Sequence, residues 1–271
     1  MTEVSAGRPA GGVWAADALS VSGVRGIPPV VPAGADLAEL IARGFARSGV
    51  ALQAWDVVVV THKVVSKAEG QVVSLATVTP SARALSLAAQ TDNDPRLVEV
   101  ILGESVRVLT SLPGVLVCET VHGLVCANAG VDRSNVGGGD VVTLLPRDSD
   151  ASAAALRAAW LPLCDDGPLG VVICDTFGRP FREAGVNVAI GVAGMPAVTD
   201  YRGTPDASGY VMRASALATA DEIASAAELV MGKVDEVPVA VVRGLRWDAS
   251  FADASGARAL QRDPARDVFR R

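Results

Sequence analysis

The stretch VVICDTFGRPFREAGVN, residues 171–187, combines the signal of a buried strand with the polar groups of a ligand site. Its first four residues are an apolar β-type run, which ends directly in the carboxylate of Asp175 and the hydroxyl of Thr176. Oxygen groups of this kind suit Mg²⁺ or Mn²⁺. A loop punctuated by Gly and Pro is predicted next, and its Arg179 and Arg182 can bind phosphate or carboxylate in a bidentate manner. On this stretch alone, a metal–phosphate site and a plain strand, turn and surface ion pair are both compatible interpretations.

The composition is that of a globular chain of 271 residues, long enough for one large domain or two small ones. Hydrophobic residues make up 50% and aromatic residues only 4%, so Val, Leu, Ala and Ile must form most of the core. The formal net charge of −6 argues against a general nucleic-acid-binding protein, which needs a basic surface. Small anionic ligands stay compatible with this charge, because local clusters of Arg and Lys can act within an acidic protein.

The four cysteines form no CxxC pair and no Cys/His spacing typical of a zinc site. Three of them lie in apolar β-like runs, where a free cysteine behaves as a small buried hydrophobic residue. We therefore expect reduced thiols in a cytoplasmic protein at Cys118, Cys126, Cys164 and Cys174. Residues 1–16 lack the order of a signal peptide, and no apolar run approaches the ~20 residues that span a bilayer, so we expect no membrane partner.

Strands and helices are predicted in an order without strict βαβ alternation, which favours a mixed α/β (α+β) fold with two lobes over a doubly wound sheet. The predicted strands are 18–24, 56–60, 106–110, 115–127, 141–145, 171–174, 188–192 and 238–242. The predicted helices are 36–45, 81–90, 94–102, 149–160 and one from 219 to about 230, where TADE is typical of a capping box. We expect 1–17 to be a flexible tail, 18–247 the folded domain and 248–271 a tail or linker.

The common nucleotide-binding motifs are absent from the sequence. No GxGxxG follows a strand, and GxxxxGK[ST] does not occur, because Gly232-Lys233 is followed by Val234. Residues 137–139 are three glycines, which are compatible both with a close approach to a phosphate and with a flexible turn. A polar segment, residues 61–70, follows the strand predicted at 56–60, and open α/β sheets place their ligands at such strand ends.

Three side chains with oxygen ligands stand at the ends of apolar runs, namely Asp132, Asp175 and Thr176. With the amide of Asn135 and nearby cations, they supply what phosphoryl transfer needs: oxygen ligands for Mg²⁺ and positive charge at the phosphate oxygens. Each residue also has a structural interpretation, since Asp132 and Asn135 suit turns and a lysine can pair with a glutamate on a solvated face. The cationic residues in question are Lys63, Lys67, Arg179 and Arg182.

The two histidines do not indicate a catalytic triad, because no GxSxG accompanies them. His122 and Gly123 predict a hairpin turn, in which the histidine has a structural role. His62 lies between the end of a predicted strand and Lys63, so a role as a base and a structural role both stay open.

Five segments resemble, in the same order, the coenzyme F420-0:L-glutamate ligase family. SKAEG, GVDRSN and DTFGRPFR together are highly specific for it, and the resemblance covers roughly residues 20–245. The segments are GIPP at 26–29, VVSKAEG at 64–70, GVDRSN at 130–135, DTFGRPFR at 175–182, and VMGK at 230–233 followed by PVAVVRG at 238–244.

The resemblance implies a GTP-dependent ligase that attaches L-glutamate to coenzyme F420-0 and then adds a further glutamate through a γ-linkage. GTP would phosphorylate the acceptor carboxylate, and the glutamate amine would displace phosphate from the resulting acyl phosphate, releasing GDP. The resemblance further implies Mg²⁺ or Mn²⁺, assistance by K⁺, and an intertwined homodimer of two-lobed subunits. In some bacteria a flavin-reductase-like domain follows, and Arg262–Arg271 would then begin the linker to it.

The same resemblance assigns roles to individual residues. Metal ligands fall on Asp132, Asp175 and Thr176. Contacts to GTP fall on Gly26, Ile27, Pro28, Pro29, His62, Lys63, Lys67 and Asn135, and on a further segment made of Met231, Gly232, Lys233, Val234, Asp235, Glu236, Val237 and Pro238. From their charge and position, Arg179 and Arg182 are hypothesised to act in catalysis by binding the carboxylates of the substrate or the transferred phosphate.

The chain departs from the family pattern at two places. His62-Lys63 stands where some relatives have Ser-Thr, and Lys233 stands where some have a glutamine that ligates a second metal. An ammonium group cannot ligate a cation, so Lys233 would neutralise phosphate charge instead. Two alternatives stay open: a ligase of the same fold with a different carboxylate acceptor, and a non-catalytic relative that binds a deazaflavin or a nucleotide.

Overall fold

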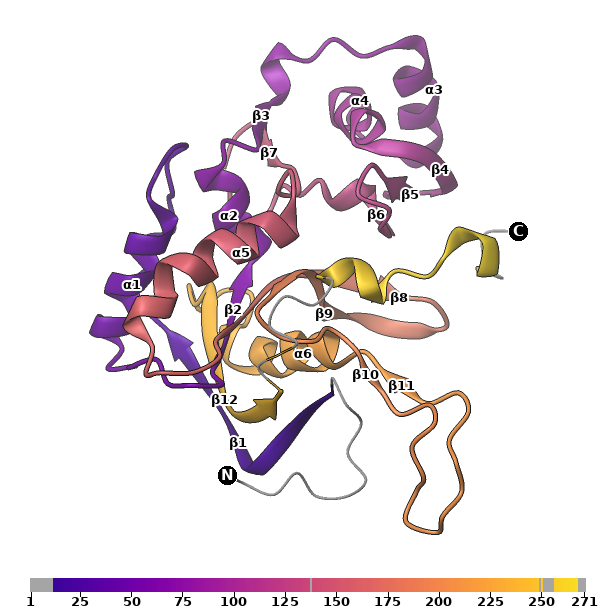
Figure 1. Ribbon diagram of the computed structural model, residues 1–271. Helices are drawn as coiled ribbons and strands as arrows, with labels where there is room; N and C mark the ends of the chain where they lie inside the picture. The colour runs from indigo at the N-terminus through magenta and orange to yellow at the C-terminus, as the bar shows by residue number, and fades with distance from the viewer. Residues whose placement is uncertain (1–11, 137, 249, 251–255, 268–271) are drawn as a thin grey trace.

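A five-stranded mixed sheet forms the centre of the molecule in a computed structural model that describes residues 12–136, 138–248, 250 and 256–267 (Figure 1). The pair at its centre, β2 and β8, is parallel, and the other neighbours are antiparallel. The parallel pairing ends at Thr61 and Cys174, beyond which β8 continues in its pairing with the fifth strand, β9. In spatial order the strands are β1 (Val13–Val24), β12 (Val239–Trp247), β2 (Val57–Thr61), β8 (Gly170–Arg179) and β9 (Arg182–Ala193).

Helices cover both faces of this sheet, which explains the unbroken run of valines in β2. Val58 and Val60 pack with α1 (Leu37–Arg47) and α5 (Ser149–Trp160), whereas the alternate residues Val57 and Val59 pack with α6 (Thr219–Met231). All four valines are fully buried. A strand that is buried on both faces needs apolar residues at every position rather than at every second one.

A smaller lobe lies beside the main sheet and has its own hydrophobic core (Figure 1). It contains the helices α3 (Ala82–Thr91) and α4 (Pro95–Gly103), which pack on an antiparallel sheet. The sheet consists of β4 (Ser105–Leu112), β5 (Val115–Thr120) and β6 (Val125–Ala127), followed by the short helix η2 (Asn128–Gly130). The pair β3 (Val72–Ser74) and β7 (Val141–Thr143), with η1 (Leu75–Thr77), connects this lobe to the main body. The mixed, two-lobed α/β architecture is therefore confirmed.

The turn predicted at His122 and Gly123 is also confirmed. It divides the predicted strand 115–127 into β5 and β6, and Gly123 has a φ of +82° that favours glycine. Cys118 and Cys126 face each other across this hairpin. Among the described residues all four cysteines are free thiols, and no helix is both long and apolar enough to pass through a membrane.

The loop predicted after Cys174 is wrong. β8 continues to Arg179, turns at Pro180 and Phe181, and pairs with β9 from Arg182 onward, so this stretch is one long hairpin. The strand predicted at 188–192 is the second half of β9. Cross-strand pairing overrides the Gly and Pro signals, because the proline lies in the turn, where it breaks no ladder hydrogen bond.

The capping box predicted at 219–222 is wrong as well. Thr219 is already helical, and the residue before it caps α6 without a side-chain hydrogen bond. The polar groups bind the sheet region instead: the Thr219 hydroxyl lies 2.8 Å from the Thr199 hydroxyl, and Asp221 accepts a hydrogen bond from the Ala189 N–H at 2.9 Å. Tertiary contacts replace the local cap.

The described parts of the two predicted tails contain secondary structure. β1 begins at Val13 and pairs with Trp247, so its first residues belong to the central sheet rather than to a tail. Near the other end, η5 (Ala257–Leu260) and η6 (Pro264–Arg266) follow, and the N–H of the buried Ala257 donates to Asp150 at 2.8 Å. Gln261 also donates to the His122 carbonyl at 3.1 Å. Residues 1–11, 249, 251–255 and 268–271 lie outside the described residues, as does the first of the three glycines, Gly137.

A β-hairpin arm projects from the main body between β9 and α6 (Figure 1). Its base is the pair β10 (Thr199–Asp200) and β11 (Ala216–Leu217), and backbone hydrogen bonds such as Gly203 N–H to the Met212 carbonyl continue the pairing along it. Tyr210 and Val211 are exposed on this arm.

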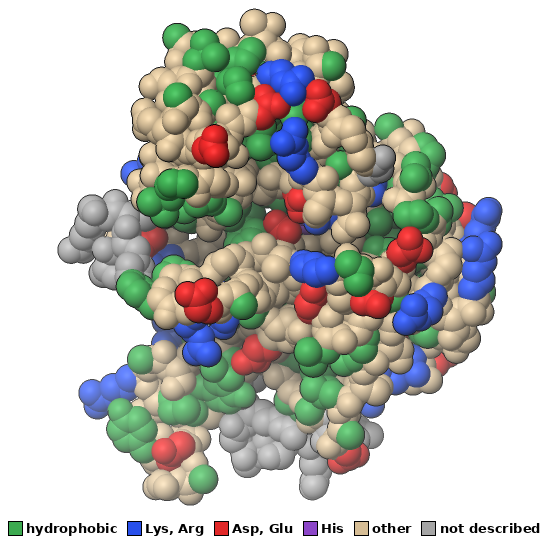
Figure 2. Space-filling view, turned by 180° about the vertical axis from the view of Figure 1, so that it is seen from behind, with side chains coloured by type: hydrophobic (Ala, Val, Ile, Leu, Met, Phe, Trp, Pro, Cys, Tyr) green, Lys and Arg blue, Asp and Glu red, His purple; other side chains and the backbone are tan. Residues whose placement is uncertain are grey.

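On the face shown in Figure 2, acidic and basic side chains are interspersed, so the electrostatic potential of this face is not of a single sign.

Candidate functional site

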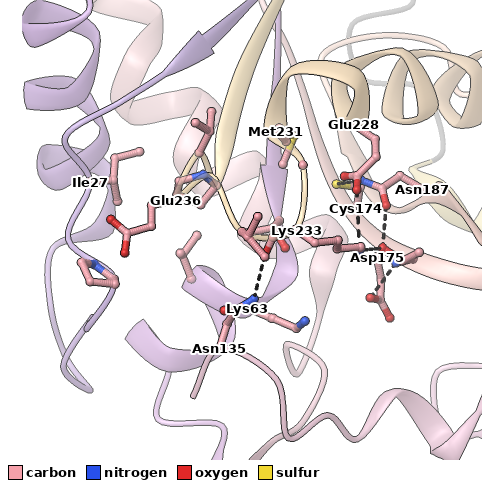
Figure 3. Close-up of a pocket in the computed structure, with 18 of the residues that line it drawn as sticks. Ile27, Lys63, Asn135, Cys174, Asp175, Asn187, Glu228, Met231, Lys233 and Glu236 are labelled. Carbon is pink, nitrogen blue, oxygen red and sulfur yellow. Dashed lines mark hydrogen bonds and ion pairs between the residues drawn. The ribbon is translucent and has the colours of Figure 1, made fainter. Parts of the chain in front are cut away.

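A cavity of about 420 Å³ opens where the parallel pairing of β2 with β8 ends (Figure 3). Thr61 and Cys174 are paired in the register of these strands, and both line the cavity. The helix α2 (His62–Ala68) and the loop after α6 form further walls. The remaining lining residues are Ile27, Pro28, Pro29, Val30, Lys63, Val64, Lys67, Asn135, Asp175, Thr176, Asn187, Glu228, Met231, Gly232, Lys233, Val234, Glu236, Val237 and Pro238.

Lys67 brings three of the predicted segments together. Its ammonium donates to the Pro29 carbonyl at 3.0 Å and to the Asn135 carbonyl at 2.5 Å. Only 8% of the residue is exposed, and burial together with the charge of Lys63 lowers the pKa of Lys67 below its ordinary value. Asn135 has a φ of +58°, a conformation that asparagine tolerates better than most residues. A buried cation with two carbonyl partners keeps these three segments in one place.

Asp175 ends the apolar part of β8 and faces His62. Its Oδ1 lies 3.3 Å from the Nε2 of His62, within ion-pair distance but without hydrogen-bond alignment, and it accepts the Thr176 N–H at 2.7 Å. Burial acts to raise the pKa of Asp175, but His62, the Thr176 N–H and Lys63 outweigh it and hold the pKa below its ordinary value. The carboxylate is therefore kept ionised next to the cavity.

Asp132 does not line the cavity itself but ends beside Lys63, which does. The two side chains form an ion pair with an N···O distance of 2.6 Å, and Ser134 donates to Asp132 from its N–H at 2.6 Å and from its hydroxyl at 3.0 Å. Burial acts to raise the pKa of Asp132, but these partners lower it overall. Backbone hydrogen bonds with Thr143 of β7 fix the position of the aspartate. Lys63 thus connects Asp132 to the Asp175 side of the cavity.

Two residues that the sequence did not reveal, Asn187 and Glu228, lie next to Thr176 and Lys233 in the cavity (Figure 3). The Thr176 hydroxyl donates to Asn187 at 2.7 Å, and the Asn187 amide donates to Glu228 at 2.8 Å. Lys233 contacts the Thr176 hydroxyl, and its ammonium lies 3.7 Å from Glu228 Oε1. Asn187 and Glu228 could have been found only from the Thr176–Asn187 register of the hairpin, which the predicted loop concealed.

Six of the predicted site residues do not line the cavity. His62 and Asp132 lie directly behind it, in contact with Asp175 and Lys63 respectively. Arg179 lies near the turn of the β8–β9 hairpin and donates to the Glu183 carbonyl at 2.9 Å. The others are Gly26, Asp235 and Arg182. The roles hypothesised for Arg179 and Arg182 stay predictions.

The donor atoms fit a hard divalent cation in type. The carboxylates of Asp132 and Asp175 and the hydroxyl of Thr176 offer only oxygen, which Mg²⁺ and Mn²⁺ prefer. In the described part of the chain, no three His, Cys, Asp or Glu side chains gather as a complete metal cage. Such a cation would therefore take its other ligands from a bound molecule or water, as is usual for Mg²⁺.

Fold and site together define a mixed α/β protein whose cavity sets Lys63, Lys67 and Lys233 against carboxylates and hydroxyls at the end of a parallel strand pair. Such a cavity suits ligands that carry phosphate or carboxylate groups. Residues 26–244 match the model of the F420-0:gamma-glutamyl ligase family, which is most of the chain, so the protein belongs to that family.

Curated relatives agree with this assignment. The chain is 45% identical over 253 residues to the coenzyme F420:L-glutamate ligase of Methanothermobacter thermautotrophicus, covering 93% of this chain and 99% of that protein. It is 46% identical over 239 residues to the protein of the same name from Methanopyrus kandleri, covering 88% and 92%. A third relative of that name, from Methanocaldococcus jannaschii, is 39% identical over 236 residues, covering 87% and 90%. The likeness extends over almost the whole length of each relative.

Proposed function

We propose that this protein is an enzyme, a GTP-dependent ligase that adds L-glutamate to coenzyme F420-0 and then adds further glutamate by γ-linkage. Membership of the ligase family and the names of the relatives support the reaction class and the two substrates. The observation that carries the proposal is the convergence at Lys67 of the segments that contain Pro29 and Asn135, in the wall of the cavity that Asp175 also lines.

GTP is proposed to lie along the cavity with its phosphates among the lysines. Lys63, Lys67 and Lys233 come from two different parts of the chain and all line this space. Positive groups that converge from several elements can bind the several charges of a triphosphate. The segments 26–29 and 231–238 would then contact the rest of the nucleotide. The apolar residues among them, such as Ile27, Met231 and Val237, would keep water from the reacting carboxylate.

Asp132, Asp175 and Thr176 are proposed to hold Mg²⁺ or Mn²⁺, with K⁺ assisting. When bound, the divalent ion would spread the charge that develops on the phosphate oxygens during transfer. The protein's own contribution is the ionised state and fixed position of the two carboxylates, which Lys63, His62 and neighbouring N–H groups maintain. The acceptor carboxylate attacks the γ-phosphate to give an acyl phosphate and GDP, and the amine of glutamate then displaces phosphate.

The direct test is incubation of the purified protein with GTP, Mg²⁺ or Mn²⁺, L-glutamate and coenzyme F420-0. We expect one GDP and one phosphate for each glutamate in the product, measured by chromatography and mass spectrometry. Absence of both GDP and glutamylated product with either metal would disprove the proposal. Product from another carboxylate acceptor in a panel, but not from F420-0, would identify a different substrate. Nucleotide binding without GDP release would indicate a non-catalytic relative.

A homodimer is proposed as the active assembly. The arm based on β10 and β11 supports this, because it projects from the main body, is ordered by its own hydrogen bonds and exposes Tyr210 and Val211. An arm with exposed apolar residues is suited to contact a second subunit. Light scattering during size exclusion should give twice the mass of one chain. A variant with residues 203–213 replaced by a short turn should give the mass of a monomer.

A further inference from the structure

The incoming amino acid brings the one organic cation among the proposed reactants. GTP, the acceptor carboxylate and the departing phosphate are all anions, and Lys63, Lys67 and Lys233 complement them. The nitrogen that attacks arrives as an ammonium group, which must lose a proton before its electron pair can form a bond. A site for this group therefore needs an accessible carboxylate close to the reacting end of the cavity.

Three carboxylates line the cavity among the described residues: Asp175, Glu228 and Glu236. The Asp175 side chain is only 14% exposed and is engaged with His62 and the Thr176 N–H. Glu236 lies at the opposite end of the cavity, near Ile27 (Figure 3). Glu228 lies beside Asn187, which is itself hydrogen-bonded to Thr176, and 27% of the Glu228 side chain is exposed (Figure 3). It alone of the three is both accessible and near the proposed reacting end.

Hydrogen bonds to neighbouring residues fix the position of Glu228. Its Oε2 accepts a hydrogen bond from the Asn187 amide at 2.8 Å, and Asn187 is itself only 4% exposed. The Asn187 carbonyl accepts from the Ser225 hydroxyl at 2.8 Å, one turn before Glu228 on α6. Asn187 thus holds one oxygen of a carboxylate that lines the cavity, and the other oxygen is the one left for a substrate group.

The charged and titratable groups around Glu228 suit a role in proton transfer. The ammonium of Lys233 lies 3.7 Å from its Oε1, on the side of the loop after α6. From β8, the thiol of Cys174 faces it, and burial together with Asp175 and Glu228 raises the pKa of that thiol, so it stays protonated. Asn187 of β9 is a neutral donor. Glu228 thus has one cationic neighbour, one neutral donor and one protonated thiol around it, on the wall of the cavity.

We propose that Glu228 binds the α-ammonium of the incoming L-glutamate and takes a proton from it as the nitrogen attacks. This inference rests on the proposed function. The nitrogen forms a bond to the carbonyl carbon of the acyl phosphate, and the bond from that carbon to the phosphate oxygen breaks. Of the three protons on the ammonium, one goes to Glu228, one leaves with the phosphate as HPO₄²⁻, and one remains on the new amide.

The experiment compares two nucleophiles in Glu228→Gln and in the wild-type enzyme. Hydroxylamine is largely uncharged at neutral pH, so it can trap the acyl phosphate as a hydroxamate without help from a base. We expect Glu228→Gln to lower the turnover of glutamate by about 100-fold while the yield of hydroxamate changes by less than about 3-fold. The matched control is Glu222→Gln, an exposed carboxylate on the same helix outside the cavity, which should leave both reactions unchanged.

The pH profile provides a second readout. In Glu228→Gln the rate with glutamate should keep rising at alkaline pH, because only the free amine in solution can react, whereas the wild-type rate should level off. Glu228→Asp, which keeps a carboxylate, should retain more glutamate turnover than the glutamine variant. Equal loss of hydroxamate and glutamate product, or wild-type turnover with an unchanged profile, would overturn the inference. A wild-type enzyme that forms no hydroxamate from GTP and F420-0 would instead contradict the proposed function.

Discussion

The motif DTFGRPFR, residues 175–182, extends over two halves of the β8–β9 hairpin that lie in different surroundings. The inner half contains Asp175 and Thr176, and the outer half is the segment from Arg179 to Arg182. The inner half carries Asp175 and Thr176 into the cavity, where they meet buried partners such as Asn187. The outer half ends in a turn at which Phe181 is 91% exposed and Arg179 bonds only to the backbone of its own hairpin among the described contacts. A motif that identifies a family therefore need not be a single site, because a strand moves away from the cavity by about 3.3 Å with each residue.

The strongest test of this difference is Asp175→Asn in the inner half. The substitution keeps the shape of the side chain but removes the charge that faces His62 and the cavity. We expect the rate of GDP release to fall by about 100-fold or more, comparable to the loss of one group that stabilises charge in a transition state. The measurement is steady-state GDP release at saturating Mn²⁺. A loss below about 3-fold would show that the inner half is not part of the reacting site.

The outer half is tested by Arg182→Ala. If Arg182 binds a substrate carboxylate, its removal should raise the KM for glutamate or F420-0 by about 10-fold with little change in kcat, since one charge-assisted hydrogen bond contributes about 1.5 kcal/mol. Kinetics for each substrate separately would give both constants. Unchanged kinetics would confine catalysis to the inner half and remove the predicted role of the arginine.

The structure of the inner half could be predicted from the sequence far better than that of the outer half, because the inner half depends on a local signal and the outer half on pairing with a distant strand. An apolar run that ends in a carboxylate is a local signal, and it correctly placed Asp175 directly after the buried part of β8. The continuation of that strand depends on pairing with β9, and Gly178 and Pro180 suggested a loop instead. Glu228 was missed for the same reason, because its contact with Asn187 joins residues 41 positions apart.

Acidification offers a further test of the inner half, because the pKa of Asp175 is lowered in the folded protein. The unfolded chain, with an ordinary pKa of about 3.9, then binds the proton more readily than the native state does. The stabilisation from this carboxylate is therefore fully present above about pH 4 and disappears as the pH falls through the lower native pKa. We expect the difference in unfolding free energy between wild type and Asp175→Asn to shrink as the pH falls below about 4. Urea titrations at several pH values measure it, and a difference that grows on acidification would contradict the assigned direction of the shift.

The smallest effect is expected at the tip of the hairpin, with Phe181→Gly. Phe181 has a φ of +62°, where a side chain is strained and glycine is not, and its ring is exposed, so little packing is lost. Relief of this strain should stabilise the protein by up to about 1 kcal/mol, reduced by the greater freedom of glycine in the unfolded chain. Thermal unfolding measures the change, and the rate of GDP release should stay at the wild-type value because the turn lies outside the cavity. A variant that is less stable would show that the contacts of the ring stabilise the protein by more than the relief of strain returns. Loss of GDP release would show that the outer half contributes to the reaction, so that the two halves differ less than their surroundings indicate.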